Sequence, residues 1–551
     1  MEITVIIYIL FRRKLHTTLA YKLFFIYCFL PQCMEREEGI ITFELNHHSK
    51  QTRLKKFLFI ILAVCSFSCY AQNKIEYLTK TDLKNDLAFL EEILENKSAY
   101  QGLNGYHYKD DFNKFLKKTK VDSITKYDFE VFLTKTIGKI GDRHATVRGD
   151  RYRDSIFFPL AFAPFNDKVL VVDYNKATKE YRFWNSEYPY LKSINHIAIE
   201  KLLPQILPGE ILAPKKSYLT RAVGDLRDVE KVFTAMNLDL PNPIVLTLAN
   251  EKGAKKNVTV KLVPTKEKAR YWDERFYRNI YVVEEEKYND SAFIDKFFSV
   301  QNNIGYIQIA DMVAKENSPV FFEFLNDFMT KAKQSDALII DVRDNGGGTR
   351  DLIEELAGYF VHPDSVYVVN ATRQRGELPL NDEFKESLHS RFLFSKDELD
   401  KREQHAADKF MSSFNPMYNL DNKKFSEYYF YVLNGQKLSA NKYHYKKPVY
   451  ILTNERSFSA ASILVSVFKG LPNVTIAGVT TDGSSGNSER FELPNSKLKG
   501  KISSMVSYQK NGKILDGIGT EPDLIIERNL DQIFGKEDFQ LNKLKELIKN
   551  R

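Results

Sequence analysis

Cysteine is absent from residues 72–551, because all four cysteines lie in the first 70 positions: Cys28, Cys33, Cys65 and Cys69. The long part of the chain therefore has no disulfide, no thiolate metal site and no cysteine nucleophile. A strong charge of one sign is lacking too. The net charge is +8, of which +4 remains downstream of residue 71, and this small, scattered excess argues against nucleic acid as a partner.

Residues 1–71 have the features of a leader. A basic stretch at 53–56 precedes an apolar run at 57–64, and small residues flank Tyr70 just before position 72. This order predicts a secretory signal peptide over 53–71, and therefore an exported protein that is periplasmic, in the cell envelope or secreted. The apolar run is shorter than the ~20 residues of a comfortable membrane span. An uncleaved membrane anchor and lipid attachment at Cys65 are the alternatives.

The segment ahead of this signal is unusual. Its apolar runs are interrupted by Arg12, Arg13 and Lys14. Since a signal peptide normally opens its chain, we expect the biological start further downstream, near Met34.

The chain of 551 residues is too long for one hydrophobic core, and roughly two to four domains are expected. Helical spacing of leucines predicts a helical domain over 72–150, with Thr81 and Asp82 as candidate caps. Short apolar runs separated by turns predict a β-rich domain over 151–265, followed by a linker at 266–300.

An α/β pattern begins near residue 300. Residues 337–342 form a continuous apolar run, typical of a strand buried on both faces, and 449–453 form another. Each precedes a predicted helix. The pattern predicts an α/β core over 301–535, with a charged, aromatic-rich insertion at 370–445 and a C-terminal helix at 536–551.

Two predicted strand-to-helix junctions carry candidate chemistry. The first reads DVRDNGGG at 341–348, and its glycines allow a tight turn that presents N–H groups to an oxygen. A turn without a ligand is the alternative. The second junction places Ser459 at a helix start, where a serine either caps the helix or acts as a nucleophile. Ser457 and Ser462 are its local rivals.

A serine nucleophile needs a base, since its hydroxyl is weakly nucleophilic at neutral pH. His144 lies where a predicted helix passes through a turn into an apolar run. The other histidines of 72–551 are isolated among aromatic, loop-like or charged residues: His107, His196, His362, His389, His405 and His444. Spacing alone leaves a structural role for His144 open.

Five segments in order resemble the C-terminal-processing (tail-specific) serine peptidases of peptidase family S41, including their tricorn-like branch. They are GDRH at 141–144, GYIQI at 305–309, DVRDNGGG at 341–348, FSAA at 458–461 and GTEPD at 519–523. The resemblance covers residues 75 to 530. Each motif is weak by itself, whereas five in the family's order are fairly specific.

The resemblance implies a crotonase/ClpP-like α/β catalytic core, an N-terminal helical domain and an intervening PDZ-like β domain. Residues 190–195 are similar to a PDZ strand, with His196 in place of its usual glycine. A PDZ-like module binds a chain end by strand addition, which suits substrates selected by their C-termini. The implied partners are proteins or peptides, with no cofactor and no metal, and membrane association through the leader remains open.

The resemblance also implies roles for individual residues. Ser459 attacks the substrate carbonyl, and the N–H groups of Ala460 and Gly347 hold the oxyanion, with Gly346 as the alternative to Gly347.

His144 is the implied general base. Glu521 and Asp142 are the two candidates for the acid that orients its ring.

The choice of base rests on a departure from the family pattern. Many members use a lysine in a GxxTxGKG segment, but GVTTDGSS at 478–485 has Ser484 at that position, which argues against a Ser–Lys mechanism. The tricorn-like branch uses an N-terminal histidine, in agreement with His144, although the branch's serine beside it is Arg143 here. Ser462 stands where many members have a glutamate.

We therefore expect an exported serine endopeptidase that works through an acyl-enzyme. A catalytically weak or inactive binding protein on the same fold is the alternative, and a non-peptide hydrolase with the same Ser–His site is a third reading.

Overall fold

The computed structural model describes residues 76–149, 155–206, 212–274, 294 and 297–550. The predicted leader with its signal peptide lies outside these residues, as does much of the predicted linker at 266–300. Within the described ranges, no helix is both long and apolar enough to cross a membrane.

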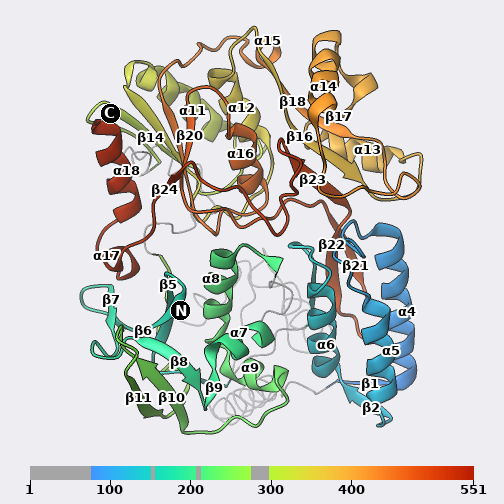
Figure 1. The fold of residues 1–551 in the computed structure, drawn as a ribbon, viewed down its shortest axis with the longest axis vertical. Helices are drawn as coiled ribbons and strands as arrows, with labels where there is room; N and C mark the ends of the chain where they lie inside the picture. Colours follow the sequence, from blue (N-terminus) through green and yellow to red (C-terminus); the bar gives the residue numbers. More distant parts are fainter. Residues whose placement is uncertain (1–75, 150–154, 207–211, 275–293, 295–296, 551) are drawn as a thin grey trace, which may run out of the picture. The chain divides into compact units, whose positions relative to one another are not determined.

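Three helices and a small sheet form the N-terminal part of the described chain (Figure 1). Thr79, and not the predicted Thr81, caps the first helix: its hydroxyl accepts the N–H of Asp82, whose carboxylate accepts the N–H of Thr79. The apolar faces of these helices pack with Leu498 and Ile502 from far along the chain. The elements are α4 (Lys80–Lys97), α5 (Tyr108–Lys118), α6 (Lys126–Gly138), and β1 (Tyr77–Thr79) antiparallel to β2 (Ser123–Thr125).

A seven-stranded sheet with three helices follows, in the region predicted to be β-rich. Its main strand order is β11-β10-β8-β6-β5, with β7 beside β6 and β9 beside β8. The strands are β5 (Ala161–Phe165), β6 (Lys168–Asn175), β7 (Glu180–Phe183), β8 (Tyr190–Ile194), β9 (Ile197–Ala198), β10 (Ile244–Ala249) and β11 (Lys255–Val260). The helices are α7 (Ile199–Ile206), α8 (Lys215–Asp225) and α9 (Val229–Ala235).

A six-stranded sheet is the centre of the C-terminal part. Its order is β13-β14-β15-β19-β20-β24, and every pair except β13–β14 is parallel. Alternate side chains of β15 pack on opposite faces, so the strand is fully buried, as its apolar run predicts. The strands are β13 (Phe298–Gln301), β14 (Ile304–Gln308), β15 (Ala337–Asp341), β19 (Val449–Thr453), β20 (Val474–Gly478) and β24 (Leu524–Ile525).

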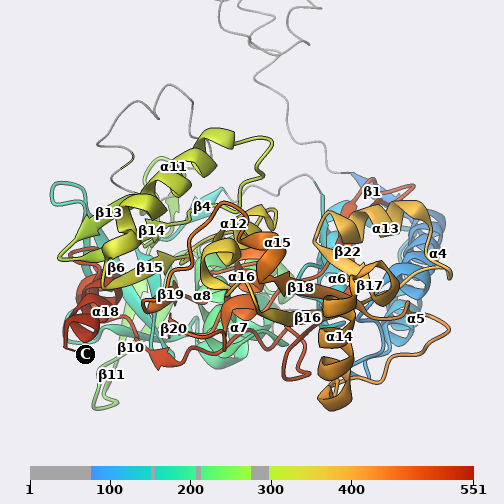
Figure 2. The ribbon, with the colours of Figure 1, turned by 90° about the horizontal axis from the view of Figure 1, so that it is seen from above.

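Helices cover both faces of this sheet. Figure 2 shows α11 and α12 on one side and α18 on the other. Because β15 and β19 are parallel neighbours, the glycine-rich loop and the Ser459 turn leave the same edge of the sheet. The helices are α11 (Pro319–Lys331), α12 (Asp351–Phe360), α16 (Ala460–Phe468), α17 (Leu530–Ile533) and α18 (Phe539–Lys549), the last in the predicted C-terminal helix.

The segment predicted as an insertion, 370–445, builds most of a second, four-stranded sheet. Its order is β17-β18-β16-β23, so strand β23 from the far end of the chain completes it. The elements are β16 (Val366–Gln374), α13 (Asp382–His389), β17 (Leu393–Ser395), α14 (Lys401–Ser413), β18 (Tyr429–Asn434), α15 (Gly435–Leu438) and β23 (Met505–Gln509).

Two small sheets join segments that are distant in sequence. One pairs β4 (Ile156–Phe157) with β12 (Val263–Pro264). The other has the order β21-β22-β3 and contains β3 (Thr146–Arg148), β21 (Ser488–Glu492) and β22 (Lys499–Ser503). This second sheet fixes the segment just after His144 against the C-terminal part of the chain.

Glu354, on α12, should make stability depend on pH. Burial raises its pKa to about 7 from 4.5, although Tyr431 and Arg350 act to lower it. The folded state then holds the proton more tightly than the unfolded state, so the free energy of unfolding falls as pH rises from 4.5 through 7. In Glu354→Gln, we expect the melting temperature to fall less between acidic and mildly alkaline buffer than in wild type. An equal fall in thermal unfolding experiments would contradict this assignment.

Candidate active site

Ser459 lies in the turn between β19 and α16, in a backbone conformation that favours a functional serine. It occupies the N-cap position of α16 with φ 53° and ψ −121°, yet its side chain makes no capping hydrogen bond. A non-glycine residue in such a region costs of order 1–3 kcal/mol and is typical of active sites. The Oγ atom instead lies 3.3 Å from Nε2 of His144. Ser459 therefore does not cap α16, although capping is the commoner role of a serine at the start of a helix.

The two rival serines are engaged elsewhere. Oγ of Ser457 donates to the carbonyl of Val342 at 2.8 Å and is fully buried. Oγ of Ser462 lies 3.2 Å from the hydroxyl of Thr481, also fully buried. Of the three, Ser459 is the one whose hydroxyl faces a histidine.

Hydrogen bonds to the carboxylate of Asp142 hold the backbone of His144 in place. The Asp142 carboxylate accepts the N–H groups of His144 at 2.8 Å and Ala145 at 3.2 Å, and the hydroxyl of Ser503 at 2.7 Å. The second carboxylate oxygen of Asp142 accepts the N–H of Ser503. Asp142, one of the two predicted orienting acids, therefore positions the His144 backbone and ties it to β22.

The carboxylate on the far side of the His144 ring belongs to Asp516, which the sequence analysis did not single out. Oδ1 of Asp516 lies 3.9 Å from Nδ1 of His144, and both atoms are buried without a hydrogen-bond partner. Oδ2 accepts the hydroxyls of Tyr100 at 2.8 Å and Ser485. Catalytic hydrogen bonds are often long in unliganded enzymes and tighten when substrate binds. Asp516 is therefore placed to orient the imidazole.

Glu521, the other predicted orienting acid, does not reach His144, and that expectation is corrected. Glu521 is exposed, and its backbone carbonyl accepts the Lys469 ammonium at 2.6 Å. The reason is local: the chain turns through Gly517 and Gly519, both at positive φ, between Asp516 and Glu521. The sequence offers one local signal that could have pointed to Asp516, an acid between the apolar Leu515 and Gly517.

The predicted oxyanion donors both lie beside Ser459, but they differ in availability. A Cβ at Gly347 would lie 2.6 Å from Cβ of Ser459, so only glycine allows the loop to approach this closely. The N–H of Gly347, however, donates to Oδ1 of Asn345 at 2.8 Å. In the described chain, no intramolecular acceptor takes the N–H of Ala460. The N–H of Ala460 is therefore available to a substrate oxyanion, whereas the N–H of Gly347 already donates to Asn345.

Ser484, at the position of the family's lysine, supports the turn that carries Ser459. Its Oγ accepts the N–H of Ser459 at 2.8 Å. A buried ion pair lies two residues away, where Oδ2 of Asp482 accepts Arg143 at 2.8 Å and Arg221 at 2.8 Å. Burial alone would raise the pKa of Asp482, but the charges of Arg221 and Arg143 keep it below its ordinary value.

The structure therefore explains why an arginine stands at position 143, where the tricorn-like branch has a serine. It joins the segment of His144 to the segment of Ser484 through Asp482, and burial lowers its own pKa to about 10. The same carboxylate accepts the hydroxyl of Ser217 on α8 at 2.7 Å. This network links three segments around the Ser–His pair.

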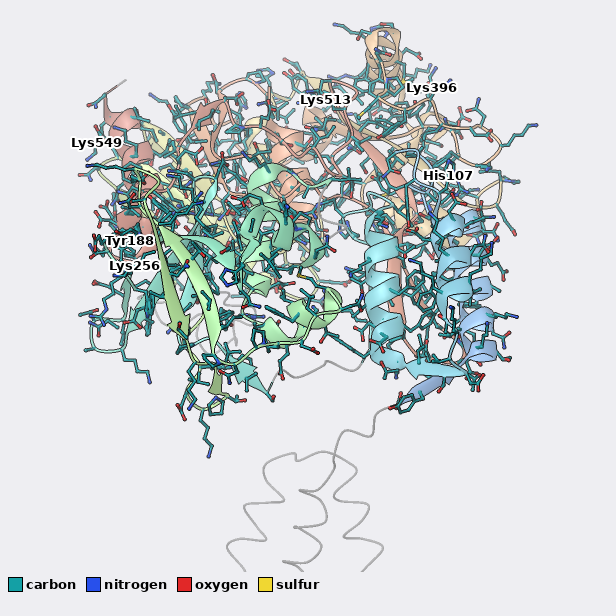
Figure 3. The ribbon with its side chains drawn as sticks, turned by 60° about the horizontal axis from the view of Figure 1, so that its bottom comes forward. His107, Tyr188, Lys256, Lys396, Lys513 and Lys549 are labelled. Carbon is teal, nitrogen blue, oxygen red and sulfur yellow. The ribbon has the colours of Figure 1, made fainter. Side chains whose placement is uncertain are left out.

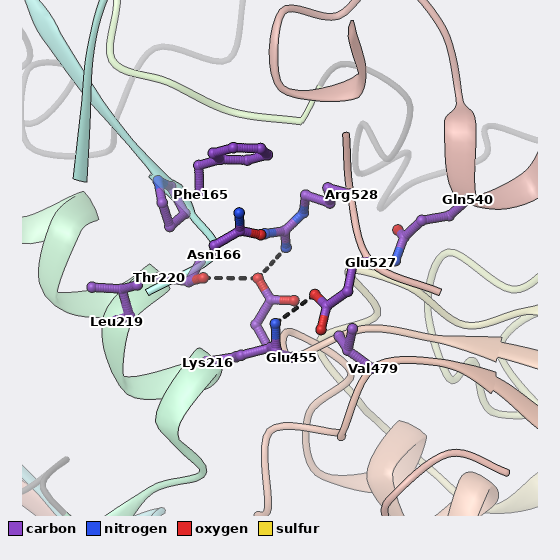
Figure 4. Close-up of a pocket in the computed structure, with 11 residues that line it drawn as sticks. Phe165, Asn166, Lys216, Leu219, Thr220, Glu455, Val479, Glu527, Arg528 and Gln540 are labelled. Atoms are coloured by element: carbon purple, nitrogen blue, oxygen red, sulfur yellow. Dashed lines mark hydrogen bonds and ion pairs between the residues drawn. The ribbon is translucent and has the colours of Figure 1, made fainter. Parts of the chain in front are cut away.

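A small pocket lies next to the Ser459 turn, lined by residues of β5, α8 and the C-terminal segment (Figure 4). Glu455, four residues before Ser459, accepts the hydroxyl of Thr220 at 2.7 Å and the guanidinium of Arg528. Lys216 and Glu527 form a second ion pair, 2.5 Å apart. These contacts anchor the Ser459 turn to α8, and they occupy both the Thr220 hydroxyl and the Lys216 ammonium.

Asp142, His144 and Asp516 also bring three potential metal ligands within 4.8 Å of one another. The Asp142 oxygens already accept four donors, and Nε2 of His144 faces Ser459. These residues therefore fit proton transfer better than cation binding.

Comparison with known proteins bears on the family and the fold. Residues 303–526 match the model of a family described as peptidase family S41. The solved structure of mature CPAF complexed with lactacystin is similar at a TM-score of 0.56 and 17% identity, covering 86% of this chain and 100% of that one. A crystal structure of mature CPAF gives 0.57 and 16%, covering 85% and 98%. At such identities the likeness shows a shared fold, and the core is a ClpP/crotonase-like α/β fold, as expected.

Proposed function

We propose that this chain, whose residues 303–526 belong to peptidase family S41, is a serine endopeptidase with Ser459 as nucleophile and His144 as general base. One observation carries the proposal: residues 315 positions apart place Nε2 and Oγ 3.3 Å from each other. A positioned base within hydrogen-bond reach is what a serine hydroxyl needs to attack at neutral pH. Its substrates are proteins or peptides, as the family implies.

The reaction proceeds through an acyl-enzyme. Ser459 Oγ bonds to the substrate carbonyl carbon while Nε2 of His144 takes its proton, and the N–H of Ala460 stabilises the oxyanion. The C–N bond then breaks, and Nε2 returns the proton to the leaving amine. Water, deprotonated by the same imidazole, then attacks the acyl carbon. The ester bond between that carbon and Ser459 Oγ breaks, and Nε2 returns the proton to Oγ, which releases the carboxylic acid and restores the serine. Asp516 holds the ring and stabilises the imidazolium that forms twice.

The second oxyanion donor would come from the glycine-rich loop. Phe458 donates its N–H to the carbonyl of Asn345 at 2.9 Å, so the loop and the nucleophile turn are already joined. For Gly347 to serve, its N–H exchanges the Asn345 side chain for the substrate oxyanion, which is a stronger, charged acceptor.

Asp516 and Glu521 offer a matched pair for testing the orienting acid. Asp516→Asn keeps the shape but removes the charge that stabilises the imidazolium, so we expect kcat to fall roughly 10²- to 10⁴-fold. Glu521→Gln makes the same chemical change at an exposed site and should leave kcat unchanged. Steady-state cleavage of a fluorogenic peptide measures both, and the opposite ranking would restore Glu521.

Export and the PDZ-like role belong to the same proposal. The order of charge, apolar run and small residues at 53–71 supports a signal peptide and a periplasmic or envelope location. The sheet that contains β8 would bind substrate chain ends by strand addition.

A ligand-binding protein on the same fold is the second candidate. The occupied N–H of Gly347 favours it, because a binding protein needs no complete oxyanion hole. Labelling with a serine-directed fluorophosphonate, beside digestion of an unfolded protein, separates the two. Wild-type protein that neither labels nor digests would support binding alone and contradict the peptidase proposal.

A further inference from the structure

The small sheet β21-β22-β3 has two chemically different faces. Side chains alternate along each strand, and Val147, Ile502 and their neighbours point into the core formed with the N-terminal helices. The opposite face carries four basic residues, which we call the basic face: Arg148, Arg490, Lys499 and Lys501. The sheet lies beside α6 in Figure 1.

Strand register brings these cations together. Arg490 is directly opposite Lys501, and Arg148 is directly opposite Lys499. Like charges at directly opposed positions destabilise a sheet. The Arg490–Lys501 pair therefore points to a functional role for these two cations.

Among the residues that the structure describes, acidic side chains compensate the basic face only in part. Glu492 lies 3.9 Å from Lys499, in an exposed pair that contributes little. Glu130 and Asp142 are nearby but lie below the surface, and Asp142 is occupied with His144 and Ser503. Burial, with the charges of Arg148, Arg490 and Arg221, lowers the pKa of Lys501 although Asp142 acts to raise it. The described side chains therefore leave a net positive field at this face.

The two strands that carry three of the four cations, β3 and β22, connect directly to the segment of His144. Strand β3 begins two residues after His144, and β22 ends at Ser503, whose hydroxyl binds the carboxylate that holds the His144 backbone. At about 3.3 Å per residue, Lys501 lies about 7 Å and Lys499 about 13 Å before Ser503 along the strand. An extended substrate of about four residues covers that length.

The side of the substrate follows from the chemistry of His144. The imidazole must give its proton to the leaving amine, so the departing C-terminal part of the substrate lies on the histidine's side of Ser459. The residues of the substrate after the scissile bond therefore run toward β3 and β22.

We propose that the basic face binds side-chain carboxylates on the C-terminal side of the scissile bond, so that the enzyme prefers substrates with acidic residues two to five positions after it. The inference rests on the proposed function and gives that same site a substrate class. Aspartate and glutamate side chains supply the carboxylates that this face would recognise.

Three fluorogenic peptides test the preference. One carries two acidic residues after the scissile bond and an amidated end, one is neutral with a free carboxylate, and one is neutral and amidated. Since an exposed ion pair contributes a factor of roughly two to five, we expect about tenfold higher kcat/KM for the acidic peptide than for the neutral amidated one. The ratio should shrink as the Debye length falls from about 10 Å in 0.1 M salt to about 3 Å in 1 M.

Charge-reversed variants assign the preference to this face. Lys499→Glu and Arg490→Glu change exposed side chains and should lower the ratio between acidic and neutral peptides to about one or below. Lys513→Glu makes the same change at an exposed lysine in the turn after β23, labelled in Figure 3, and should keep the wild-type ratio. The neutral peptide with a free carboxylate separates the effect of the chain end from that of the acidic side chains: a preference for it without a preference for the acidic peptide would overturn the inference.

The outcomes separate this inference from the proposed function. Equal kcat/KM for all three peptides, with neutral cleavage intact, overturns the inference and leaves the peptidase standing. Cleavage of none contradicts the peptidase. Fluorescence anisotropy with Ser459→Ala then decides the inference separately: tighter binding of the acidic peptide supports it, and equal binding overturns it.

Discussion

Replacing Ser459 with alanine should reduce peptide cleavage by roughly 10³- to 10⁶-fold. The substitution removes the atom that forms the acyl-enzyme while leaving the N–H of Ala460 and the binding surfaces in place. It also removes the Oγ that a fluorophosphonate would phosphonylate. We therefore expect cleavage and labelling to disappear together, measured by fluorogenic assay and by intact-mass spectrometry.

The nearby serines provide the controls for this result. Ser457→Ala removes a buried hydroxyl that donates to the carbonyl of Val342, and Ser462→Ala removes one that lies beside the hydroxyl of Thr481. Because neither hydroxyl faces His144, both variants should still be labelled by the probe. Because Ser459 sits at φ 53°, alanine there retains the strain, and a melting temperature close to that of wild type shows that the fold survives. Labelling that persists in Ser459→Ala would move the nucleophile elsewhere.

Replacing His144 with alanine should lower kcat by a similar factor, roughly 10³- to 10⁶-fold. Without Nε2 at 3.3 Å, the Ser459 hydroxyl has no base to remove its proton and the leaving amine has no acid to protonate it. The loss is therefore expected in kcat more than in KM. Fluorophosphonate labelling should slow as well, since the same deprotonation precedes it.

Lys497 is the control for a Ser–Lys mechanism. It lies on the turn between β21 and β22 with φ 58°, so asparagine, which tolerates this conformation, is the suitable replacement. Lys497→Asn should keep kcat, because Ser484 and not a lysine contacts Ser459 at the family's lysine position. Loss of activity in this variant, with activity retained in His144→Ala, would restore the Ser–Lys reading.

The agreement between sequence and structure is closest where the signal is local. The apolar run at 337–342 predicts a strand buried on both faces, and β15 is fully buried. The glycines after it and Ser459 after β19 follow from the same pattern, since both are strand-to-helix junctions. In the N-terminal part, the leucine spacing predicts α4, but the cap lies at Thr79 because a cap depends on the local path of the chain entering the helix.

Charge is an example of what a sequence total hides. An excess of +4 downstream of the leader suggests an ordinary solvated surface. Strand pairing nevertheless collects Arg148, Arg490, Lys499 and Lys501 on one side of a small sheet. Since 342 positions separate Arg148 from Arg490, their proximity is a property of register and not of composition.

By itself, the sequence determined the order of the elements, the two junctions that carry the glycines and Ser459, and His144 as the candidate base. Only the tertiary structure decided that Asp516 and not Glu521 faces the ring, that Asn345 occupies the N–H of Gly347, and that Asp142 holds the His144 backbone. The physical reason is range. Periodicity and turn chemistry act over a few residues, whereas a hydrogen bond depends on tenths of an ångström between segments that packing alone brings together.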